Sequence, residues 1–339
     1  VICKLILCFI ERGCRLCEKL PAGVVVTGRP DLWKIGVYYA GIFALILYAP
    51  RLKTGLTRIT VNCTVVMALI SLQVIDPCHS LKLTMLSVGQ GQCIFIRSPD
   101  GKGILYDCGS TSEKNIGRYR VVPFLKSSGI GRLDYCIVSH MDEDHISGYM
   151  ELLADDEIDA LRIGSFILPD IGNPDEAYKE LEKEAAAKGI AIYKVCSGNE
   201  FKLGQIQVRC VNPERGVCYE DKNTYSAVLE LKYGDFSALL TGDVQNEGEE
   251  AAAGLIDGSY TLLQVAHHGS KNSSISEFLE AARPRIAVIS CGRNNRYGHP
   301  HEEAIERLRQ YTDKIYTTVD AGAITVVSNG KKAYLKTFL

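Results

Sequence analysis

Two long apolar runs without charged residues dominate the first part of the chain. The runs are "IGVYYAGIFALILYA" (35–49) and "ITVNCTVVMALISLQVI" (59–75), with a short basic segment between them. Each is slightly shorter than the ~20 residues that comfortably span a bilayer, but two uncharged helices in tandem are uncommon in a soluble core. The pattern predicts a two-helix transmembrane hairpin over residues 31–80. The alternative interpretation is a pair of buried core helices.

Residues 1–30 have apolar positions at helical spacing with charges between them. This spacing predicts an amphipathic or membrane-associated helix, which lies in the membrane interface or completes a helix bundle. The chain starts at Val1 without an initiator methionine or a signal-peptide layout. We therefore expect this segment to belong to a truncated upstream region of a longer protein.

The basic residues beside the two apolar runs bear on membrane orientation. Arg51, Lys53 and Arg58 lie between the runs and favour a cytoplasmic loop, with both flanks on the outer side. Arg29 and Lys34, ahead of the first run, favour the opposite orientation. The prediction is a multi-pass cell-membrane protein whose remaining domain lies on the extracytoplasmic side.

Residues 81–339 alternate short apolar strands with helical segments. Strand-like runs occur in two groups, and helices are predicted at 144–153, 175–188, 276–282 and 301–311. Two strand groups with interspersed helices predict two sheets packed face to face with helices outside. The net charge is only −2, so no general basic field indicates nucleic-acid binding, and any such site must be local.

Six of the seven histidines form pairs that are close in sequence: His140 and His145, His267 and His268, His299 and His301. Imidazole is a common ligand of transition metals, and carboxylates can bridge two ions. In the HxDxDH segment, His140 and Asp142 can serve one cation, and Asp144 and His145 a second cation beside it. Asp243 and His268 each follow an apolar strand, so the edge of a sheet would present them to the same ions.

Five ordered motifs together carry a family resemblance. They are "SVGQGQ" (87–92), "LYDCG" (105–109), HxDxDH (140–145), "TGD" (241–243) and "HHGS" (267–270). This set resembles the metallo-β-lactamase hydrolase superfamily and is similar, more narrowly, to the C-terminal domain of the ComEC DNA-internalisation competence proteins. The resemblance implies an α/β fold for residues 81–339, the four-layer αββα metallo-β-lactamase sandwich, preceded by an α-helical membrane segment.

The resemblance also implies roles for individual residues. His140 and Asp142 match ligands of a first divalent ion, and Asp144 and His145 match those of a second. Asp243 matches the carboxylate that bridges the ions, and His268 matches a late histidine ligand. Asp107 corresponds to a buried acid that supports the ligand loop. The expected catalytic residues are Asp144 at the ions, and His267 and His299, which would face substrate phosphate and protonate the leaving oxygen.

Two departures from the family pattern affect the first ion. Asp142 replaces the usual histidine, and no histidine lies between His145 and His267 to supply a third ligand. That interval offers oxygen donors such as Asn223 to Ser226, which favour Mn²⁺ or Mg²⁺ over Zn²⁺. Gln92 stands where the competence proteins usually have an acid.

The leading functional hypothesis is a membrane-anchored nuclease that degrades one DNA strand during uptake in natural competence and transformation. The residues expected to contact substrate are Lys271, Asn272, Ser273, Arg293, Arg296 and Tyr297. The expected partners are single- or double-stranded DNA, the membrane, other helices of the full-length channel protein and competence DNA receptor proteins. The alternatives are a phosphodiesterase or esterase acting on a small substrate, and a catalytically impaired DNA-binding module.

Overall fold

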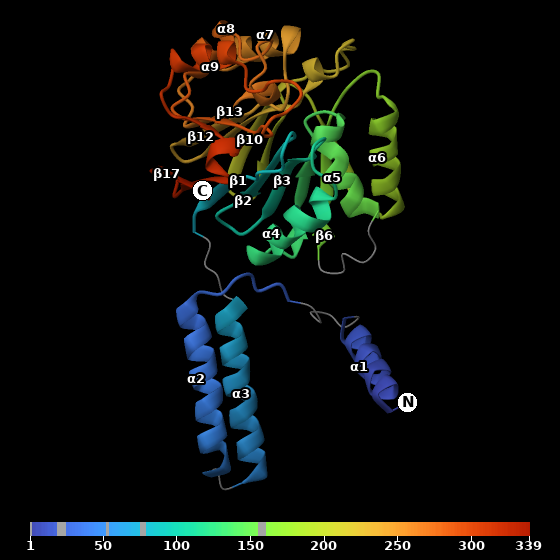
Figure 1. The fold of residues 1–339 in the computed structure, drawn as a ribbon, viewed down its shortest axis with the longest axis vertical. Coiled ribbons are helices and arrows are strands. Elements are labelled where there is room, and N and C mark those ends of the chain that lie inside the picture. Colours follow the sequence, from blue (N-terminus) through green and yellow to red (C-terminus); the bar gives the residue numbers. More distant parts are fainter. Residues whose placement is uncertain (1, 19–24, 52–53, 75–78, 155–160) are drawn as a thin grey trace. The chain divides into compact units, whose positions relative to one another are not determined.

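The structure is a computed structural model, and it describes all residues except 1, 19–24, 52–53, 75–78 and 155–160. The chain divides into two compact units, shown in Figure 1. One unit comprises Val1–Pro77 and Pro123–Gly131, and the other comprises Cys78–Val122 and Arg132–Leu339. Along the chain, helix α4 (Val122–Ser127) contains the boundary between Val122 of the second unit and Pro123 of the first.

The first unit is helical. Its elements before the boundary helix are α1 (Ile2–Glu18), α2 (Leu32–Tyr48), η1 (Ala49–Arg51) and α3 (Gly55–Val74). Helices α2 and α3 lie side by side, and Gly41 of α2 packs against the side chain of Leu69 of α3 (Figure 1). The segments Leu32–Arg51 and Gly55–Leu72 are long and apolar enough to cross a membrane, judged by length and composition.

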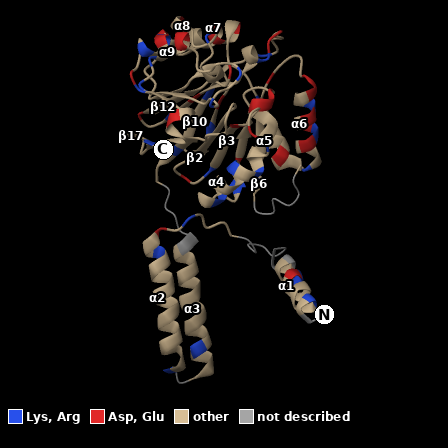
Figure 2. Cartoon of the chain, viewed as in Figure 1, with Lys and Arg blue, Asp and Glu red and all other residues tan. Residues whose placement is uncertain are grey.

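Charged residues are sparse along these two helices. Lys34 of α2 and Arg58 of α3 lie near the ends of their helices, and neither helix contains an acidic residue (Figure 2). Apolar side chains such as Leu32, Phe43 and Leu56 are exposed, which makes the pair compatible with a membrane segment. Two features of the prediction, Lys53 and the end of the second run at Ile75, lie outside the described residues.

The second unit contains two large sheets in its described residues. The first sheet has the strand order β17-β16-β1-β2-β3-β5-β7-β8. Its strands are β1 (Leu81–Met85), β2 (Cys93–Arg97), β3 (Gly103–Cys108), β5 (Tyr135–Ile137), β7 (Ser165–Pro169), β8 (Ala191–Val195), β16 (Ile324–Ser328) and β17 (Ala333–Thr337). A short pair, β4 (Arg132–Leu133) and β6 (Arg162–Ile163), lies outside it.

The second sheet has the order β15-β14-β13-β12-β11-β10-β9. Its strands are β9 (Glu200–Leu203), β10 (Ile206–Asn212), β11 (Val228–Tyr233), β12 (Phe236–Leu240), β13 (Leu262–Gln264), β14 (Ala287–Ile289) and β15 (Ile315–Thr317). Strands β12 to β15 are parallel, so their carboxyl ends meet at one edge of the sheet. Chemically active loops usually follow such strand ends.

The main core lies between the two sheets. Leu83, Ile94 and Tyr106 of the first sheet are buried in one cluster with Leu229 and Leu240 of the second. Alternating apolar residues on the strands make this face-to-face packing possible, because successive side chains point to opposite faces.

Helices cover the outer faces of both sheets. α5 (Glu143–Ala154) and α6 (Glu176–Ala187) pack on the first sheet, where the hydroxyl of Tyr149 donates to the carbonyl of Leu105. α7 (Asn246–Leu255), α8 (Ser276–Ala282) and α9 (Glu302–Arg309) lie near the second sheet in Figure 1, and residues such as Ala252, Phe278 and Leu308 share a buried cluster with it. The predicted four-layer αββα sandwich is therefore confirmed.

Each helix predicted in this unit is present, with ends within two residues of the prediction. Helix α7 was not predicted, because its acidic first turn and two glycines obscure the apolar face. The remaining short elements are η2 (Gly117–Val121), η3 (Asn223–Tyr225), η4 (Ala266–Gly269) and α10 (Thr318–Ala321).

Candidate metal centre

The ligand-rich segment spans the end of a strand and the start of a helix. After β5 the chain passes through His140 and Asp142, and α5 begins at Glu143, so Asp144 and His145 lie in the first helical turn. The carbonyl of Asp142 accepts hydrogen bonds from the amides of His145, at 2.9 Å, and Ile146, at 3.1 Å. The partial positive charge of a helix N-terminus stabilises carboxylates placed there.

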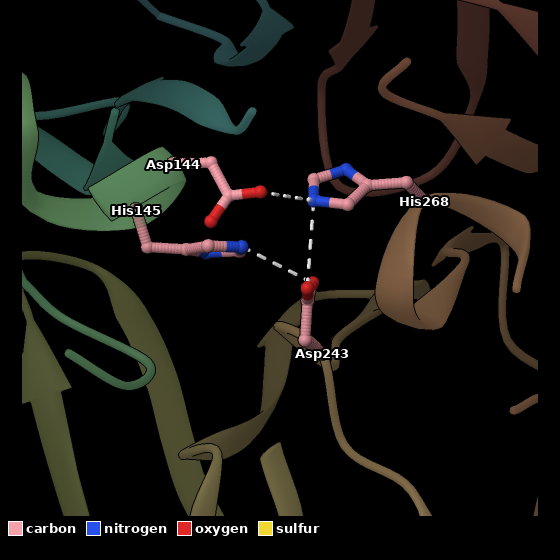
Figure 3. Close-up of side chains that lie close together, drawn as sticks. All are labelled: Asp144, His145, Asp243 and His268. Atoms are coloured by element: carbon pink, nitrogen blue, oxygen red, sulfur yellow. Dashed lines mark ion pairs between the residues drawn. The ribbon is translucent and has the colours of Figure 1, made fainter. Parts of the chain in front are cut away.

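Four side chains from three distant segments converge at one edge of the sandwich. The ligand atoms of Asp144, His145, Asp243 and His268 all lie within 4.8 Å of one another (Figure 3). Nε2 of His145 is 3.2 Å from Oδ1 of Asp243, and Nε2 of His268 is 3.4 Å from Oδ2 of the same carboxylate. Nε2 of His268 is also 3.4 Å from Oδ2 of Asp144.

The cluster fits a divalent cation. Among the described residues, Nε2 of His145, Nε2 of His268 and Oδ1 of Asp243 are buried without a hydrogen-bond partner. Such atoms are costly in a folded protein unless something compensates them. Two imidazole nitrogens and two carboxylates that face one point form a ligand set suited to Mn²⁺, Zn²⁺ or a similar ion.

The other ring nitrogen of each imidazole is fixed by a hydrogen bond. Nδ1 of His145 donates to Oδ2 of Asp107 at 2.8 Å, and Nδ1 of His268 donates to the carbonyl of Ser290 at 2.8 Å. Because each Nδ1 is a donor, each neutral ring presents its Nε2 lone pair to the cluster. This is the arrangement that orients histidine ligands in metal sites.

Asp107, the expected supporting acid, contacts both the ligand loop and His145. It is buried and has a left-handed backbone, with φ of 55°. Besides His145, its carboxylate accepts hydrogen bonds from the amide of Ser139, at 2.7 Å, the hydroxyl of Ser139, at 2.8 Å, and Nε2 of Gln92, at 2.9 Å. Asp107, at the end of β3, is therefore hydrogen-bonded both to the ligand loop at Ser139 and to the imidazole of His145.

The electrostatics of the cluster favour charged carboxylates. Burial would raise the pKa of Asp144, but the contact with His268 and the charges of His145 and His268 hold it down, to about 2. Burial would also raise the pKa of Asp243, yet the same two histidines hold it well below its usual value. Burial lowers the pKa of His145, but Asp243 and Asp107 outweigh it and the pKa is well above the ordinary value. A cation would replace such a proton, because metal binding requires neutral imidazole.

The backbone at the late motifs allows this convergence. Gly242 has φ of 54°, and a Cβ there would lie 2.5 Å from Cβ of Ser139, so glycine lets the two ligand segments approach. The side-chain Oε1 of Gln264 accepts from the amides of Thr241, at 2.6 Å, and Gly242, at 2.9 Å. His268 itself has φ of 54°, an uncommon conformation for a non-glycine residue that often marks functional sites.

Comparison with known proteins agrees with this geometry. The family described as "Metallo-beta-lactamase superfamily" matches residues 86–293. The chain belongs to the metallo-beta-lactamase superfamily. The match contains all three segments that supply the four clustered ligands, so the predicted superfamily is confirmed.

Curated relatives of this superfamily member include competence proteins. The chain is 31% identical to ComE operon protein 3 of Bacillus subtilis over 288 residues, and the alignment covers 80% of this chain and 36% of the relative. It is 32% identical to Recombination protein 2 of Haemophilus influenzae over 242 residues, with 71% of this chain and 28% of the relative covered. It is 28% identical to Competence protein ComA of Neisseria gonorrhoeae over 250 residues, with 73% of this chain and 32% of the relative covered. The predicted resemblance to competence proteins is confirmed, and the chain spans about a third of the length of these relatives.

His140 and Asp142 lie beside the four-residue cluster. The rings of His140 and His145 have centroids 4.2 Å apart, and Nε2 of His140 is 3.7 Å from Oδ2 of Asp142. Nε2 of His140 is buried without a hydrogen-bond partner in the described part of the chain. Its Nδ1 lies 3.4 Å from Oγ of Ser226, a residue in the interval where the sequence left a third ligand open.

His267 and His299, the two histidines expected to face substrate, lie beside the cluster. Nδ1 of His267 donates to Oε1 of Gln245 at 2.9 Å, and its Nε2 is 3.9 Å from Oδ2 of Asp243. Burial lowers the pKa of His267, and burial with the neighbouring histidines lowers that of His299 to about 4. Both rings are therefore neutral near pH 7. A donor role would require that they first take up a proton.

The loop after the second histidine pair is held by an arginine. The guanidinium of Arg307 donates to the carbonyls of Lys271 and Ser273, each at 2.8 Å. Lys271 and Asn272 are exposed. Ser273 is buried, and its hydroxyl donates to the carbonyl of Ala266 at 2.9 Å, which gives it a contact within the loop.

Tyr297, an exposed aromatic residue, lies next to His299. The rings of His299 and Tyr297 stack with centroids 5.6 Å apart and an interplanar angle of 19°. The guanidinium of Arg296 lies 4.7 Å from the Tyr297 ring centroid. Arg293 is exposed in the same loop.

The sequence missed several residues that orient the ligands: Ser139, Ser290, Gln245 and Gln264, and it left the role of Gln92 open. Most of these are neutral polar residues at or next to the motif strands. Their burial beside a strand end is the signal that could have identified them, and burial is a property of the folded chain.

Proposed function

We propose that this chain is the membrane-anchored hydrolase part of a DNA-uptake protein, and that its metal centre hydrolyses phosphodiester bonds of one DNA strand. The observation that carries the proposal is the convergence of Asp144, His145, Asp243 and His268 at one edge of the sandwich. The competence proteins among the relatives support DNA as the substrate class. The two apolar helices support membrane attachment.

Different residues of the site would bind the metal ion, orient its ligands and transfer the proton. An ion bound at the cluster would supply Lewis-acid polarisation of a phosphoryl oxygen. Asp107 and Ser290 keep the two histidine ligands oriented. His267 and His299, both neutral near pH 7, would take a proton from the attacking water and deliver it to the leaving oxygen.

Substrate would be held along the exposed surface beside the histidines. Tyr297 stacks on His299, so a nucleobase could extend this stack, and Arg296 beside the ring would contact phosphate. Lys271 and Asn272 would contact the strand from the neighbouring loop, and Arg293 from the same loop as Tyr297. Stacking on an aromatic ring requires an unpaired base, which favours single-stranded over double-stranded DNA.

We keep the predicted metal preference, Mn²⁺ or Mg²⁺ with Zn²⁺ as the alternative, as part of this proposal. The same holds for the extracytoplasmic position of the hydrolase unit, the multi-pass membrane location, and contacts with other helices of a longer channel protein and with competence DNA receptor proteins. The basic residues Arg51, in η1, and Arg58, near the start of α3, lie at the same end of the helix pair and support this orientation.

The proposal is tested with the full chain in detergent micelles, incubated with end-labelled single-stranded DNA and Mn²⁺. We expect cleavage that a chelator stops and that Asp144→Ala and Asp243→Ala abolish. Asp257→Ala is the matched control, because Asp257 is an exposed carboxylate that pairs with Arg283 at the surface. No cleavage with any divalent ion, or equal cleavage by Asp144→Ala, would refute the nuclease function.

One observation favours a second candidate. The pair His140 and Asp142 lacks a third histidine ligand, because no histidine occurs between His145 and His267, and this agrees with a DNA-binding module of low or no activity. DNA binding that persists in chelator, with no cleavage, would identify this function.

A further inference from the structure

Lys222 lies beside Asp142, which with His140 forms the pair of ligands predicted for the first ion. Its ammonium lies 3.5 Å from Oδ1 of Asp142 and 2.7 Å from Oδ2 of Asp175. The other oxygen of Asp175 accepts the amide of Tyr178 at 2.8 Å and caps helix α6. The lysine is therefore anchored by a helix cap that has no part in the metal cluster.

This contact changes what Asp142 can offer a cation. Oδ2 of Asp142 faces Nε2 of His140 at 3.7 Å, while the ammonium engages Oδ1. A carboxylate whose charge is already balanced by an ammonium binds a divalent ion less strongly, and the ammonium also repels that ion. None of the four clustered ligands has a recorded ion pair with a lysine or arginine among the described residues.

The remaining donors at this position are weak. The hydroxyl of Ser226 accepts the amide of Asp243 at 3.2 Å and lies near Nδ1 of His140, so it is already engaged. Nε2 of His140 is buried without a hydrogen-bond partner in the part of the chain that is described. One imidazole and one carboxylate that is paired with a lysine suit an ion that exchanges, but not one held as firmly as at the four-residue cluster.

We propose that the metal centre is asymmetric, with one resident ion at Asp144, His145, Asp243 and His268, and that Lys222 makes the adjacent position at His140 and Asp142 a weak, exchangeable cation site. This inference rests on the metal centre of the proposed function and not on its substrate. The ammonium is a positive charge at Asp142, where a bound phosphate would otherwise depend on a second cation.

Metal titration of the full chain in detergent micelles tests the proposal without DNA. After removal of metal, Mn²⁺ is added and followed by calorimetry, and Mn²⁺ paramagnetic resonance distinguishes an isolated ion from a coupled pair. We expect one tightly bound ion per chain with the spectrum of an isolated ion, and a second ion that binds at least about tenfold more weakly.

Substitutions assign this difference to the lysine. Lys222→Met should tighten the second ion by about tenfold and produce the coupled spectrum, because it removes one positive charge near Asp142. Lys222→Arg keeps the charge and should behave as wild type. Lys179→Met is the matched control, because Lys179 lies on the same helix that Asp175 caps but pairs with Glu176.

Two ions of equal affinity in the wild-type chain, or an unchanged second affinity in Lys222→Met, would overturn the proposal. Because no nucleic acid is present, this result is independent of whether the chain cleaves DNA. A chain that binds one tight ion and cleaves nothing would refute the proposed nuclease and leave the asymmetric centre in place.

Discussion

Replacing Asp107 by asparagine perturbs the metal centre without changing any ligand. The substitution keeps the shape of the side chain but converts one carboxylate oxygen into an NH₂ group. Asp107 accepts hydrogen bonds from four donors: the amide and hydroxyl of Ser139, Nε2 of Gln92 and Nδ1 of His145. An amide has only one oxygen, so at least one buried donor must face the new NH₂ group.

The two possible orientations of the asparagine give the size of the effect. If its oxygen remains near His145, the NH₂ group faces the amide of Ser139, which costs about 1–3 kcal/mol for an unsatisfied buried donor. If its NH₂ group faces His145, the ring must accept at Nδ1 and carry its proton at Nε2, so the lone pair is lost to the metal. We therefore expect Mn²⁺ affinity to fall by about 10- to 100-fold, or about 1.4–2.7 kcal/mol.

Calorimetric titration of the full chain with Mn²⁺ measures this effect, and circular dichroism of the metal-free protein checks that the fold is retained. Asp134→Asn is the control, since Asp134 also accepts a backbone amide, that of Gly103 at 3.1 Å, but contacts none of the clustered ligands. If Asp107→Asn bound Mn²⁺ as tightly as the control, the orientation of His145 by Asp107 would not determine metal affinity.

Three further changes test other parts of the fold. Burial raises the pKa of Glu249 from 4.5 to about 8, so the stability of the wild-type protein falls as the pH rises between these values. Glu249→Gln should therefore unfold at a higher temperature than wild type at pH 8, and this difference should shrink toward pH 4.5. Gly109→Ala should weaken Mn²⁺ binding, because the new Cβ would lie 2.3 Å from the backbone that joins the ligands Asp144 and His145. Gly254→Ala is the control: its Cβ meets nothing within 4 Å, so the Mn²⁺ titration should be unchanged. Tyr260→Phe should cost about 1.5–3 kcal/mol in chemical unfolding, because the hydroxyl donates to the buried carboxylate of Glu230 at 2.8 Å, and an unchanged midpoint would contradict this.

The clustered ligands were predictable because they belong to short motifs whose residue types are uncommon at such spacing. Asp144 and His145 are adjacent in sequence, and Asp243 and His268 each come shortly after an apolar strand. The family resemblance also pointed to Asp107 as a supporting acid. The sequence did not predict that Ser273 turns inward, because solvent exposure in a loop depends on hydrogen bonds such as the one to Ala266.

The sequence by itself determined the two apolar helices, the alternation of strands and helices, and the chemical types of the metal ligands. These properties depend on local periodicity and on neighbours along the chain. Only the tertiary structure decided which ligands meet, since Asp144, Asp243 and His268 come from segments that only the packing of two sheets brings together. It also decided that Lys222, anchored by Asp175, lies beside Asp142. The strength of a charge contact depends on distance and burial in three dimensions, and neither is written in the order of residues.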